Sequence, residues 1–175
     1  HPRPDERHTR SSDVRDLSRL IVEHAGVEFN VEGNPVPGFL EIVEETRPDQ
    51  CTLVPDVPNQ LTSDHGWNLY EDAGRIEPLV SRLQEYGIRV SLFMDPALDQ
   101  IDIAKSIGAN RIELYTEPYA KAYGRKELND IWSRFDRAAA YARSIGLGVN
   151  AGHDLNLQNL SRFLEIPGIL EVSIG

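Results

Sequence analysis

Residues 90–95 read Val-Ser-Leu-Phe-Met-Asp, a short apolar run that stops on an acid. Runs of about four to eight such residues, bounded by polar residues or glycine, are typical of buried strands. Five other stretches repeat the pattern, at residues 29–32, 52–55, 112–116, 148–153 and 172–175. The chain is therefore expected to contain six strands, several of which end in acids, amides or a histidine.

Helical patterns fill the intervals between these stretches. Apolar residues recur at spacings of three and four in a segment from Ser12 to about residue 25, and again at 37–47, 76–87, 97–108, 126–145 and 156–165. Strands that alternate with helices in this way are parallel and are joined by right-handed crossovers. All the strand ends then lie on one side of the sheet, where parallel α/β proteins carry out their chemistry.

Six strands suit either an open doubly wound sheet or most of a closed (β/α)8 barrel. Residues 1–4 read as a loop that leaves a strand, and Gly175 stops where a loop and a last helix would begin. These two ends favour the barrel. We therefore expect an α/β protein in which residues 1–175 are a single (β/α) barrel domain, truncated at both ends, with about six of the eight strands.

The composition excludes several classes of function. The chain has 175 residues, of which 40% are hydrophobic, and a formal net charge of -10. An acidic chain without a basic stripe is a poor ligand for nucleic acid or an anionic membrane surface, although a few arginines can still hold a small phosphorylated substrate. The single cysteine, Cys51, excludes an internal disulfide and suits a reducing compartment. No apolar run approaches the roughly 18 residues of a membrane span.

Three of the strand-end residues can transfer protons. His1 and His153 are imidazoles, and Glu32 is a carboxylate at the end of the stretch 29–32. Histidine titrates near neutral pH, and partial burial can raise the pKa of a glutamate toward the same range. The alternatives are a structural loop histidine for His153 and a solvated strand-end carboxylate for Glu32. The small residues 150–152 favour a functional His153, because they let a ligand approach the backbone closely.

Five segments of the chain resemble the pyridoxine 5′-phosphate synthase family. They are HPRPDERH at 1–8, FNVEGN at 29–34, LVP at 53–55 with QLT at 60–62, IELYTEPYA at 112–120, and VNAGHDL at 149–155. The resemblance implies a (β/α)8 barrel enzyme of vitamin B6 biosynthesis. Such an enzyme condenses 1-deoxy-D-xylulose 5-phosphate with 3-amino-2-oxopropyl phosphate to give pyridoxine 5′-phosphate, phosphate and water. It also implies catalysis without a metal or organic cofactor, and a cytoplasmic homo-octamer.

The resemblance implies a role for each candidate site residue. His1 and Glu32 match the proton acceptors of the family, and His153 matches its proton donor. The positions that hold deoxyxylulose phosphate are matched by Arg3, His8 and Thr62. Gly175 matches the first residue of a Gly-His pair that binds the phosphate of the second substrate, and Asp154 is a substrate-binding position where some relatives have glycine.

Two other functions fit the same strand ends. A barrel isomerase or epimerase could hold a divalent metal ion through Glu32, Asp95, Glu113 and His153, because carboxylates and histidines are suitable ligands. This alternative leaves Arg3, His8 and Thr62 without a role. A catalytically inactive barrel that binds a phosphorylated ligand is the other alternative. Glu113 itself is expected inside the barrel, either as a substrate ligand or as a satisfied interior acid.

Overall fold

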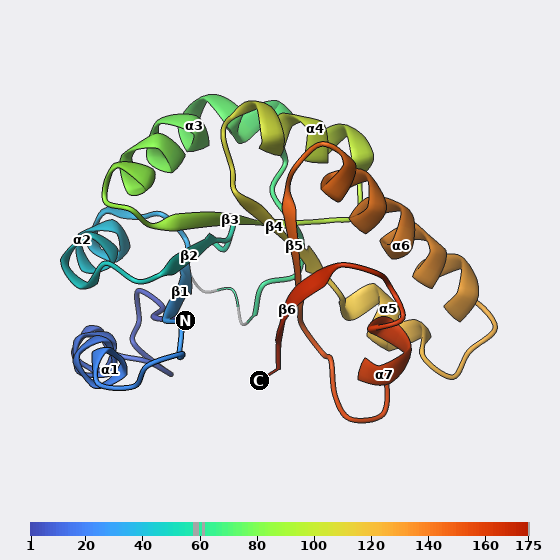
Figure 1. The fold of residues 1–175 in the computed structure, drawn as a ribbon, viewed down its shortest axis with the longest axis horizontal. Helices are drawn as coiled ribbons and strands as arrows, with labels where there is room; N and C mark the ends of the chain where they lie inside the picture. Colours follow the sequence, from blue (N-terminus) through green and yellow to red (C-terminus); the bar gives the residue numbers. More distant parts are fainter. Residues whose placement is uncertain (58–59, 61, 175) are drawn as a thin grey trace.

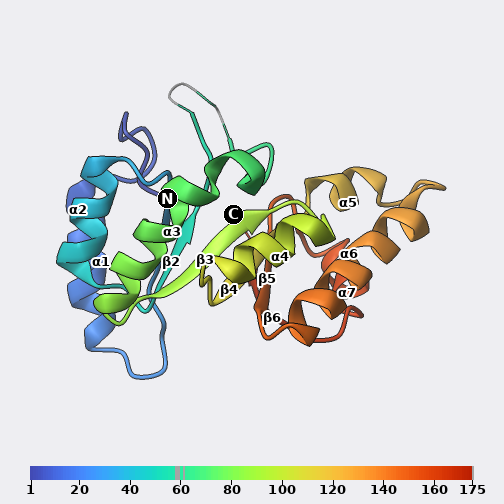
Figure 2. The ribbon, with the colours of Figure 1, turned by 90° about the horizontal axis from the view of Figure 1, so that it is seen from above.

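A computed structural model of the chain describes residues 1–57, 60 and 62–174. Its six strands form one parallel sheet in the order β1-β2-β3-β4-β5-β6, so every strand lies beside its neighbour in the sequence. The sheet curls into an arch, with α2, α3, α4 and α6 along its convex side and the two chain ends at its two limbs (Figures 1 and 2). This curled, helix-covered parallel sheet is a partial (β/α)8 barrel, as the sequence predicted.

Each strand overlaps its predicted stretch, with bounds that differ by up to three residues. They are β1 (Asn30–Gly33), β2 (Gln50–Leu53), β3 (Arg89–Met94), β4 (Arg111–Tyr115), β5 (Gly148–Gly152) and β6 (Ile169–Ser173). The helices are α1 (Ser11–Val22), α2 (Pro37–Thr46), α3 (Leu69–Glu85), α4 (Leu98–Ser106), α5 (Glu117–Ala122), α6 (Leu128–Ser144) and α7 (Leu160–Phe163). None of the helices in the described ranges is both long and apolar enough to cross a membrane.

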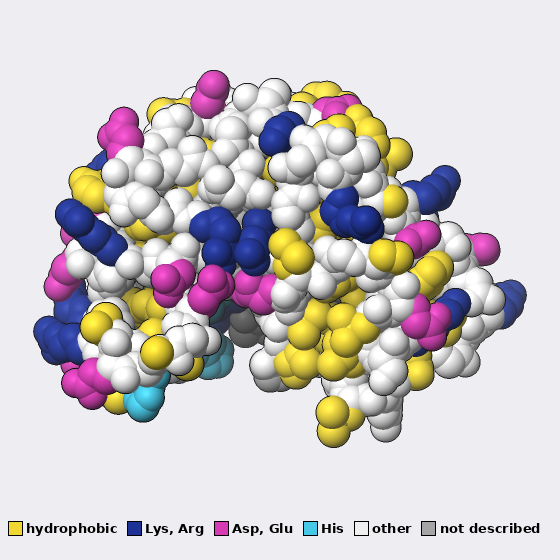
Figure 3. Space-filling view, in the orientation of Figure 1, with side chains coloured by type: hydrophobic (Ala, Val, Ile, Leu, Met, Phe, Trp, Pro, Cys, Tyr) yellow, Lys and Arg dark blue, Asp and Glu magenta, His cyan; other side chains and the backbone are white. Residues whose placement is uncertain are grey.

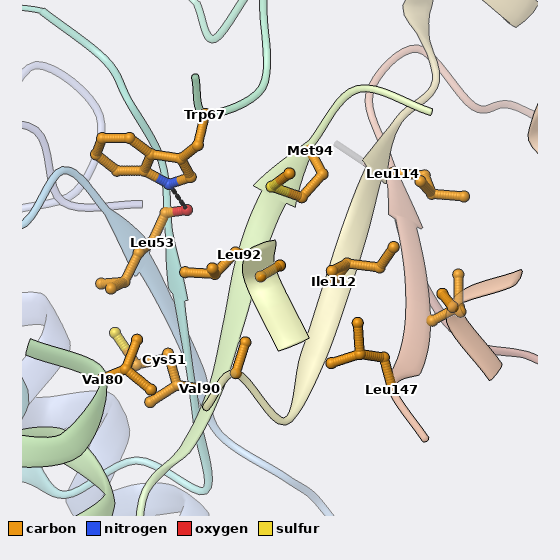
Figure 4. Close-up of a cluster of buried hydrophobic side chains, with 14 of the residues drawn as sticks. Cys51, Leu53, Trp67, Val80, Val90, Leu92, Met94, Ile112, Leu114 and Leu147 are labelled. Atoms are coloured by element: carbon orange, nitrogen blue, oxygen red, sulfur yellow. Dashed lines mark hydrogen bonds between the residues drawn. The ribbon is translucent and has the colours of Figure 1, made fainter. Parts of the chain in front are cut away.

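The hydrophobic core lies between the convex face of the sheet and the helices. Alternate strand residues such as Leu92, Met94, Ile112 and Leu114 are fully buried there (Figure 4). This alternation follows from the strand period of two, which sends every second side chain to the same face. Cys51 is buried in this core, where desolvation raises the pKa of its thiol, and it is a packing residue.

The concave face of the sheet is mostly polar. Near the amino ends of the strands, buried polar side chains bond one another across the inside of the arch. Gln50 Nε2 of β2 lies 3.3 Å from Glu171 Oε2 of β6, and Asn150 Nδ2 of β5 lies 3.2 Å from the same carboxylate oxygen. The bond between Gln50 and Glu171 joins β2 and β6, which are not neighbours in the sheet, and so stabilises its curvature.

A β-bulge between β5 and β6 decides which residues of β6 face inward. Val149 pairs with Ile169, but the next residue of β5, Asn150, pairs with Glu171. Leu170 is therefore the extra residue of β6, and its side chain is 60% exposed. A bulge shifts the inward and outward alternation of a strand by one residue. Here it places Glu171 on the concave face beside Asn150.

Helix α3 begins at Leu69, earlier than the predicted residue 76, and contains Pro78 in its interior. The cause is tertiary, since the side-chain oxygen of Gln100 in α4 accepts a hydrogen bond of 2.7 Å from the Leu69 N–H. That bond satisfies one of the unpaired N–H groups of the first turn. The segment before the helix is also anchored, because the indole of Trp67 donates to the Leu53 carbonyl at 2.8 Å (Figure 4).

Two further expectations about helices were wrong. Helix α5 was not predicted, although Pro118 lies in its first turn, a position that proline favours. The helix predicted over 156–165 is confined to α7. Asn156 and Asn159 explain the shorter helix, because their side-chain oxygens accept backbone N–H groups of the same segment. Such local bonds compete with helix formation.

Candidate active site at the carboxyl ends of the strands

The carboxyl ends of β1 and β2 bring a histidine, two carboxylates and an arginine together. His1 Nδ1 lies 3.1 Å from Glu32 Oε1, and His1 Nε2 lies 3.6 Å from Asp56 Oδ2. Arg3 Nη1 is 3.0 Å from the same Asp56 oxygen. Asp56 is buried, and among the described residues its Oδ1 has no hydrogen-bond partner. An imidazole between two carboxylates is placed to accept and return a proton.

A cavity of about 540 Å³ opens beside this cluster, with His1, Arg3, Asn34, Asp56 and Gln60 in its wall. The guanidinium of Arg3 donates to the Gln60 carbonyl at 3.1 Å, and the Arg7 guanidinium donates to the same carbonyl. Arginine binds phosphate oxygens in pairs, and the volume suits a small ligand. The cavity therefore combines a proton-transfer group with cationic side chains that suit a phosphorylated substrate.

The carboxyl end of β5 has an unusual backbone. His153 and Asp154 follow Gly152 and have φ angles of 87° and 58°. Residues other than glycine rarely adopt such positive φ angles. Thr116 Oγ1 lies 2.6 Å from the Gly152 carbonyl oxygen and 2.5 Å from that of His153. Strained backbone of this kind persists only where its surroundings hold it, and it is concentrated at functional sites.

Two aromatic rings hold the side chain of His153. The imidazole packs edge to face against Phe93 at 5.1 Å and against Tyr115 at 5.3 Å between ring centroids. Both residues belong to the small cluster of buried apolar side chains at the carboxyl ends of the strands, apart from the main core. The ring of His153 is thus oriented by contacts from β3 and β4.

Glu113 of β4 is the most deeply buried acid of this region, with 1% of its surface exposed. Among the described residues its Oε2 has no hydrogen-bond partner. Burial raises the pKa of this carboxyl well above its ordinary value, and the negative charge of Glu32 raises it further. A hydrogen bond from Ser173 acts in the opposite direction. The surroundings of Glu113 therefore favour its protonated form.

The structure brings together some of the predicted site residues and leaves others apart. His1, Arg3 and Glu32 form one cluster. His8 and Thr62 are exposed, and neither lines the cavity beside His1. Asp154 borders a separate open hollow with Lys121 and Asn156. Gly175 lies outside the described residues.

Sequence reasoning missed Asp56, and for Glu113 it left the alternatives of substrate ligand and satisfied acid open. Asp56 directly follows the predicted strand 52–55, so the rule that placed Glu32 at a strand end could have found it. For Glu113 the unpaired Oε2 contradicts the description of a satisfied acid. Tyr119 is buried in α5, where its hydroxyl donates to the Asn159 carbonyl at 2.7 Å.

The geometry does not favour the divalent-metal alternative. Within residues 1–57, 60 and 62–174, no group of three or more histidine, cysteine, aspartate or glutamate side chains is arranged to hold a metal ion. Asp95, one of the suggested ligands, has a structural contact, because its Oδ2 accepts the Gly66 N–H at 3.2 Å. The suggested ligand Glu113 is the buried acid with the raised pKa.

The fold and the strand-end groups define the class of protein, a (β/α) barrel enzyme with titratable side chains gathered at the carboxyl ends of its strands. The chain belongs to the family described as pyridoxal phosphate biosynthesis protein PdxJ, which matches residues 1–175.

Relatives at half identity carry the name pyridoxine 5′-phosphate synthase. One from Albidiferax ferrireducens is 50% identical over 181 residues, with 100% of this chain and 72% of the relative covered. Another from Porphyromonas gingivalis is 50% identical over 176 residues, with the same coverage.

Solved structures support the fold alone. The chain superposes on the EAL domain of Xanthomonas citri FimX with a TM-score of 0.63 at 12% identity, which covers 90% of this chain and 62% of that one. It also superposes on the putative copper homeostasis protein CutC of Streptococcus agalactiae, with a TM-score of 0.64 at 16% identity and coverage of 94% and 80%.

Proposed function

We propose that the chain carries the acid-base site of a pyridoxine 5′-phosphate synthase. In this function it condenses 1-deoxy-D-xylulose 5-phosphate with 3-amino-2-oxopropyl phosphate, and releases phosphate and water. The observation that carries the proposal is the contact of His1 with Glu32 and Asp56 at the carboxyl ends of β1 and β2, beside Arg3. Family membership over residues 1–175 and the names of the half-identical relatives support the same reaction.

The reaction needs several proton transfers at neighbouring atoms. An amine adds to a ketone, phosphate leaves, and a ring closes and loses water, so one base does not suffice. We assign the proton acceptors to His1 and Glu32, whose side chains lie 3.1 Å apart. We assign proton donation to His153, which Phe93 and Tyr115 orient. Groups on three different strand ends then serve different atoms of the bound substrates.

Glu113 adds a buried carboxyl whose pKa is raised well above its ordinary value. Its raised pKa follows from burial and from the charge of Glu32. A protonated carboxyl beside a carboxylate resembles the arrangements in which two acids take opposite roles, because their environments separate their pKa values. We propose that Glu113 donates a hydrogen bond or a proton to an oxygen of the substrate while Glu32 acts as base.

The binding assignments follow the phosphates of the two substrates. Arg3 binds the phosphate of deoxyxylulose phosphate, supported by its place in the cavity wall. For His8, Thr62, Asp154 and Gly175 the family motif is the only support, and their binding roles remain predictions. Arg3 is held by Asp56 in the structure, so phosphate binding must compete with that ion pair.

A direct assay tests the function. The purified protein is incubated with both substrates, and pyridoxine 5′-phosphate is measured by its absorbance while released phosphate is measured separately. The two products are expected in equal amounts, and omission of either substrate is expected to abolish both. Binding of the substrates without any product would instead favour the inactive phosphate-ligand barrel.

Exhaustive chelation separates the synthase from the metal-dependent isomerase. We propose catalysis without a metal ion or organic cofactor, so activity is expected to survive a chelator followed by desalting. Loss of activity that one divalent ion restores would transfer the assignment to the isomerase class. Elemental analysis of the treated protein provides the control for complete removal.

We further propose that residues 1–175 belong to one barrel domain, and that the protein works in the cytoplasm as a homo-octamer. The single continuous sheet supports the domain assignment, and the resemblance to the family supports the other two. Sedimentation analysis of the purified protein measures the oligomer. A stable monomer or dimer at micromolar concentration would contradict the octamer.

A further inference from the structure

The carboxyl of Glu113 lies in a tight niche made by β5 and β6. Gly152, at the end of β5, pairs with Tyr115 on one side and with Ser173 on the other. A Cβ atom at Gly152 would lie 2.1 Å from Glu113 Oε1 and 3.0 Å from the Cβ of Ser173. A side chain at this position would therefore displace the Glu113 carboxyl from the place it occupies in the structure.

Ser173 lies beside this carboxyl, since its Cβ and the Oε1 atom of Glu113 are both within 3.0 Å of the Cβ position at Gly152. A hydrogen bond between the Ser173 and Glu113 side chains lowers the pKa of Glu113. The β-bulge at Leu170 makes the contact possible, because it turns Glu171 and then Ser173 toward the concave face of the sheet. Without the extra residue, the alternation of β6 would send Ser173 to the opposite face.

One oxygen of the Glu113 carboxyl has no hydrogen-bond partner among the described residues that form this niche. Oε2 of Glu113 is buried, and no described residue bonds to it. The charged groups that face Glu113 are Glu32 from β1 and Glu171 from β6, both negative. A buried polar atom without a partner is unfavourable unless it serves a purpose, such as contact with a ligand.

We propose that Ser173 and Gly152 are positioning residues, which hold one oxygen of the Glu113 carboxyl so that the other is free for the substrate. The inference rests on the proposed synthase function, in which Glu113 acts as an acid. Gly152 provides the space and Ser173 provides the orientation. Neither residue needs to touch the substrate.

Replacement of the Ser173 hydroxyl tests the positioning role by kinetics. In Ser173→Ala, kcat is expected to fall by about tenfold, with the KM of both substrates little changed, because a hydrogen bond to an ionisable group is lost. The same loss raises the pKa of Glu113, so the limb of the pH-rate profile that reports this group is expected to move to higher pH. Ser173→Thr retains a hydroxyl and is expected to restore the profile.

Ser91→Ala provides the matched control. Ser91 is another buried serine, on β3, and its hydroxyl has no partner among the described residues. Removal of an unpaired hydroxyl is expected to leave both kcat and the pH profile unchanged. An equal effect of Ser91→Ala and Ser173→Ala would overturn the inference in favour of a general packing effect.

Infrared spectroscopy gives a readout that does not depend on activity. The carboxylic C=O band of Glu113 is assigned by its loss in Glu113→Gln, and it is expected to move to higher frequency in Ser173→Ala. Gly152→Ala is expected to move the same band by displacing the carboxyl, and thermal unfolding checks that each variant is folded. An unmoved band in a folded Ser173→Ala would overturn the inference even if the synthase reaction is demonstrated. A protein that makes no product but shows the shift would refute the proposed function alone.

Discussion

The inside of the curled sheet contains two polar layers that differ in how well their groups are satisfied. At the amino ends of the strands, Gln50, Arg89, Arg111, Asn150 and Glu171 bond one another. Arg89 Nε donates to the Gln50 side chain at 2.8 Å, and Arg111 Nη1 donates to Asn150 at 3.1 Å and to Glu171 at 3.2 Å. Charged side chains of both signs also lie next to one another near β3 and β4 on the face that Figure 3 shows.

The layer at the carboxyl ends is different. There the buried atoms Asp56 Oδ1 and Glu113 Oε2 have no hydrogen-bond partner among the described residues. His153 is held by aromatic rings and lies on strained backbone. Buried polar groups that bond one another stabilise a fold. Unpaired buried groups destabilise it, and they occur where a ligand supplies the missing hydrogen-bond partner. The comparison assigns stability to the amino-end layer and chemistry to the carboxyl-end layer.

The largest effect is expected from Glu32→Gln, which tests the chemical role of the carboxyl-end layer. The change keeps the size of the side chain but removes the base, so turnover is expected to fall by on the order of a hundredfold or more while substrate binding persists. Steady-state kinetics with each substrate varied measure this. Glu41→Gln, at an exposed position of α2, is the matched control. Near-normal turnover in Glu32→Gln would show that another group is the base.

The next effect concerns stability in the amino-end layer. Gln50→Leu leaves the partners of a fully buried side chain unsatisfied, including Arg89 and Glu171. The free energy of unfolding is expected to fall by about 2 to 3 kcal/mol. Urea denaturation measures it, and Gln158→Leu at an exposed position is the control, expected within about 0.5 kcal/mol of the unchanged protein. If Gln50→Leu instead impaired catalysis without loss of stability, the division between the two layers would fail.

A somewhat smaller effect is expected from Arg3→Ala. Removal of the guanidinium should weaken the apparent affinity for deoxyxylulose phosphate by roughly 2 kcal/mol, because a charged contact to phosphate is lost. The KM for the aminoketone substrate is expected to change little. Arg134→Ala, on the exposed face of α6, serves as the control for charge. A defect confined to the aminoketone substrate would reassign the Arg3 site.

The smallest effect is expected on the pH dependence of stability. The pKa of Glu113 is raised in the folded protein, so this group stabilises the fold below its ordinary pKa of 4.5, and the contribution disappears as pH rises through the folded value. Glu113→Gln is therefore expected to melt higher than the unchanged protein at alkaline pH, on the order of a few degrees. Thermal unfolding from pH 5 to about pH 9 measures the difference. The same pH dependence of the melting temperature in the two proteins would show that the pKa of Glu113 is not raised in the folded protein.

The order of strands and the class of fold could be predicted from local patterns. Short apolar runs such as 90–95 and 112–116 predicted β3 and β4, because burial on a parallel sheet selects such residues wherever the strand lies. Helix boundaries depended more on distant residues. The start of α3 needs Gln100 from another helix, and the turn of Asn156 and Asn159 shortens α7.

The sequence by itself determined which chemical groups end the strands, since Glu32 and His153 follow directly from their positions after apolar runs. Only the tertiary structure decided how these groups are paired. Asp56 joins His1 because β1 and β2 are neighbours, and Glu113 has an oxygen without a partner among the described residues, in the niche that Gly152 and the bulged strand β6 form around its carboxyl. The physical reason is that residue type is a local property, whereas burial, pKa and hydrogen-bond satisfaction depend on residues brought together from distant parts of the chain.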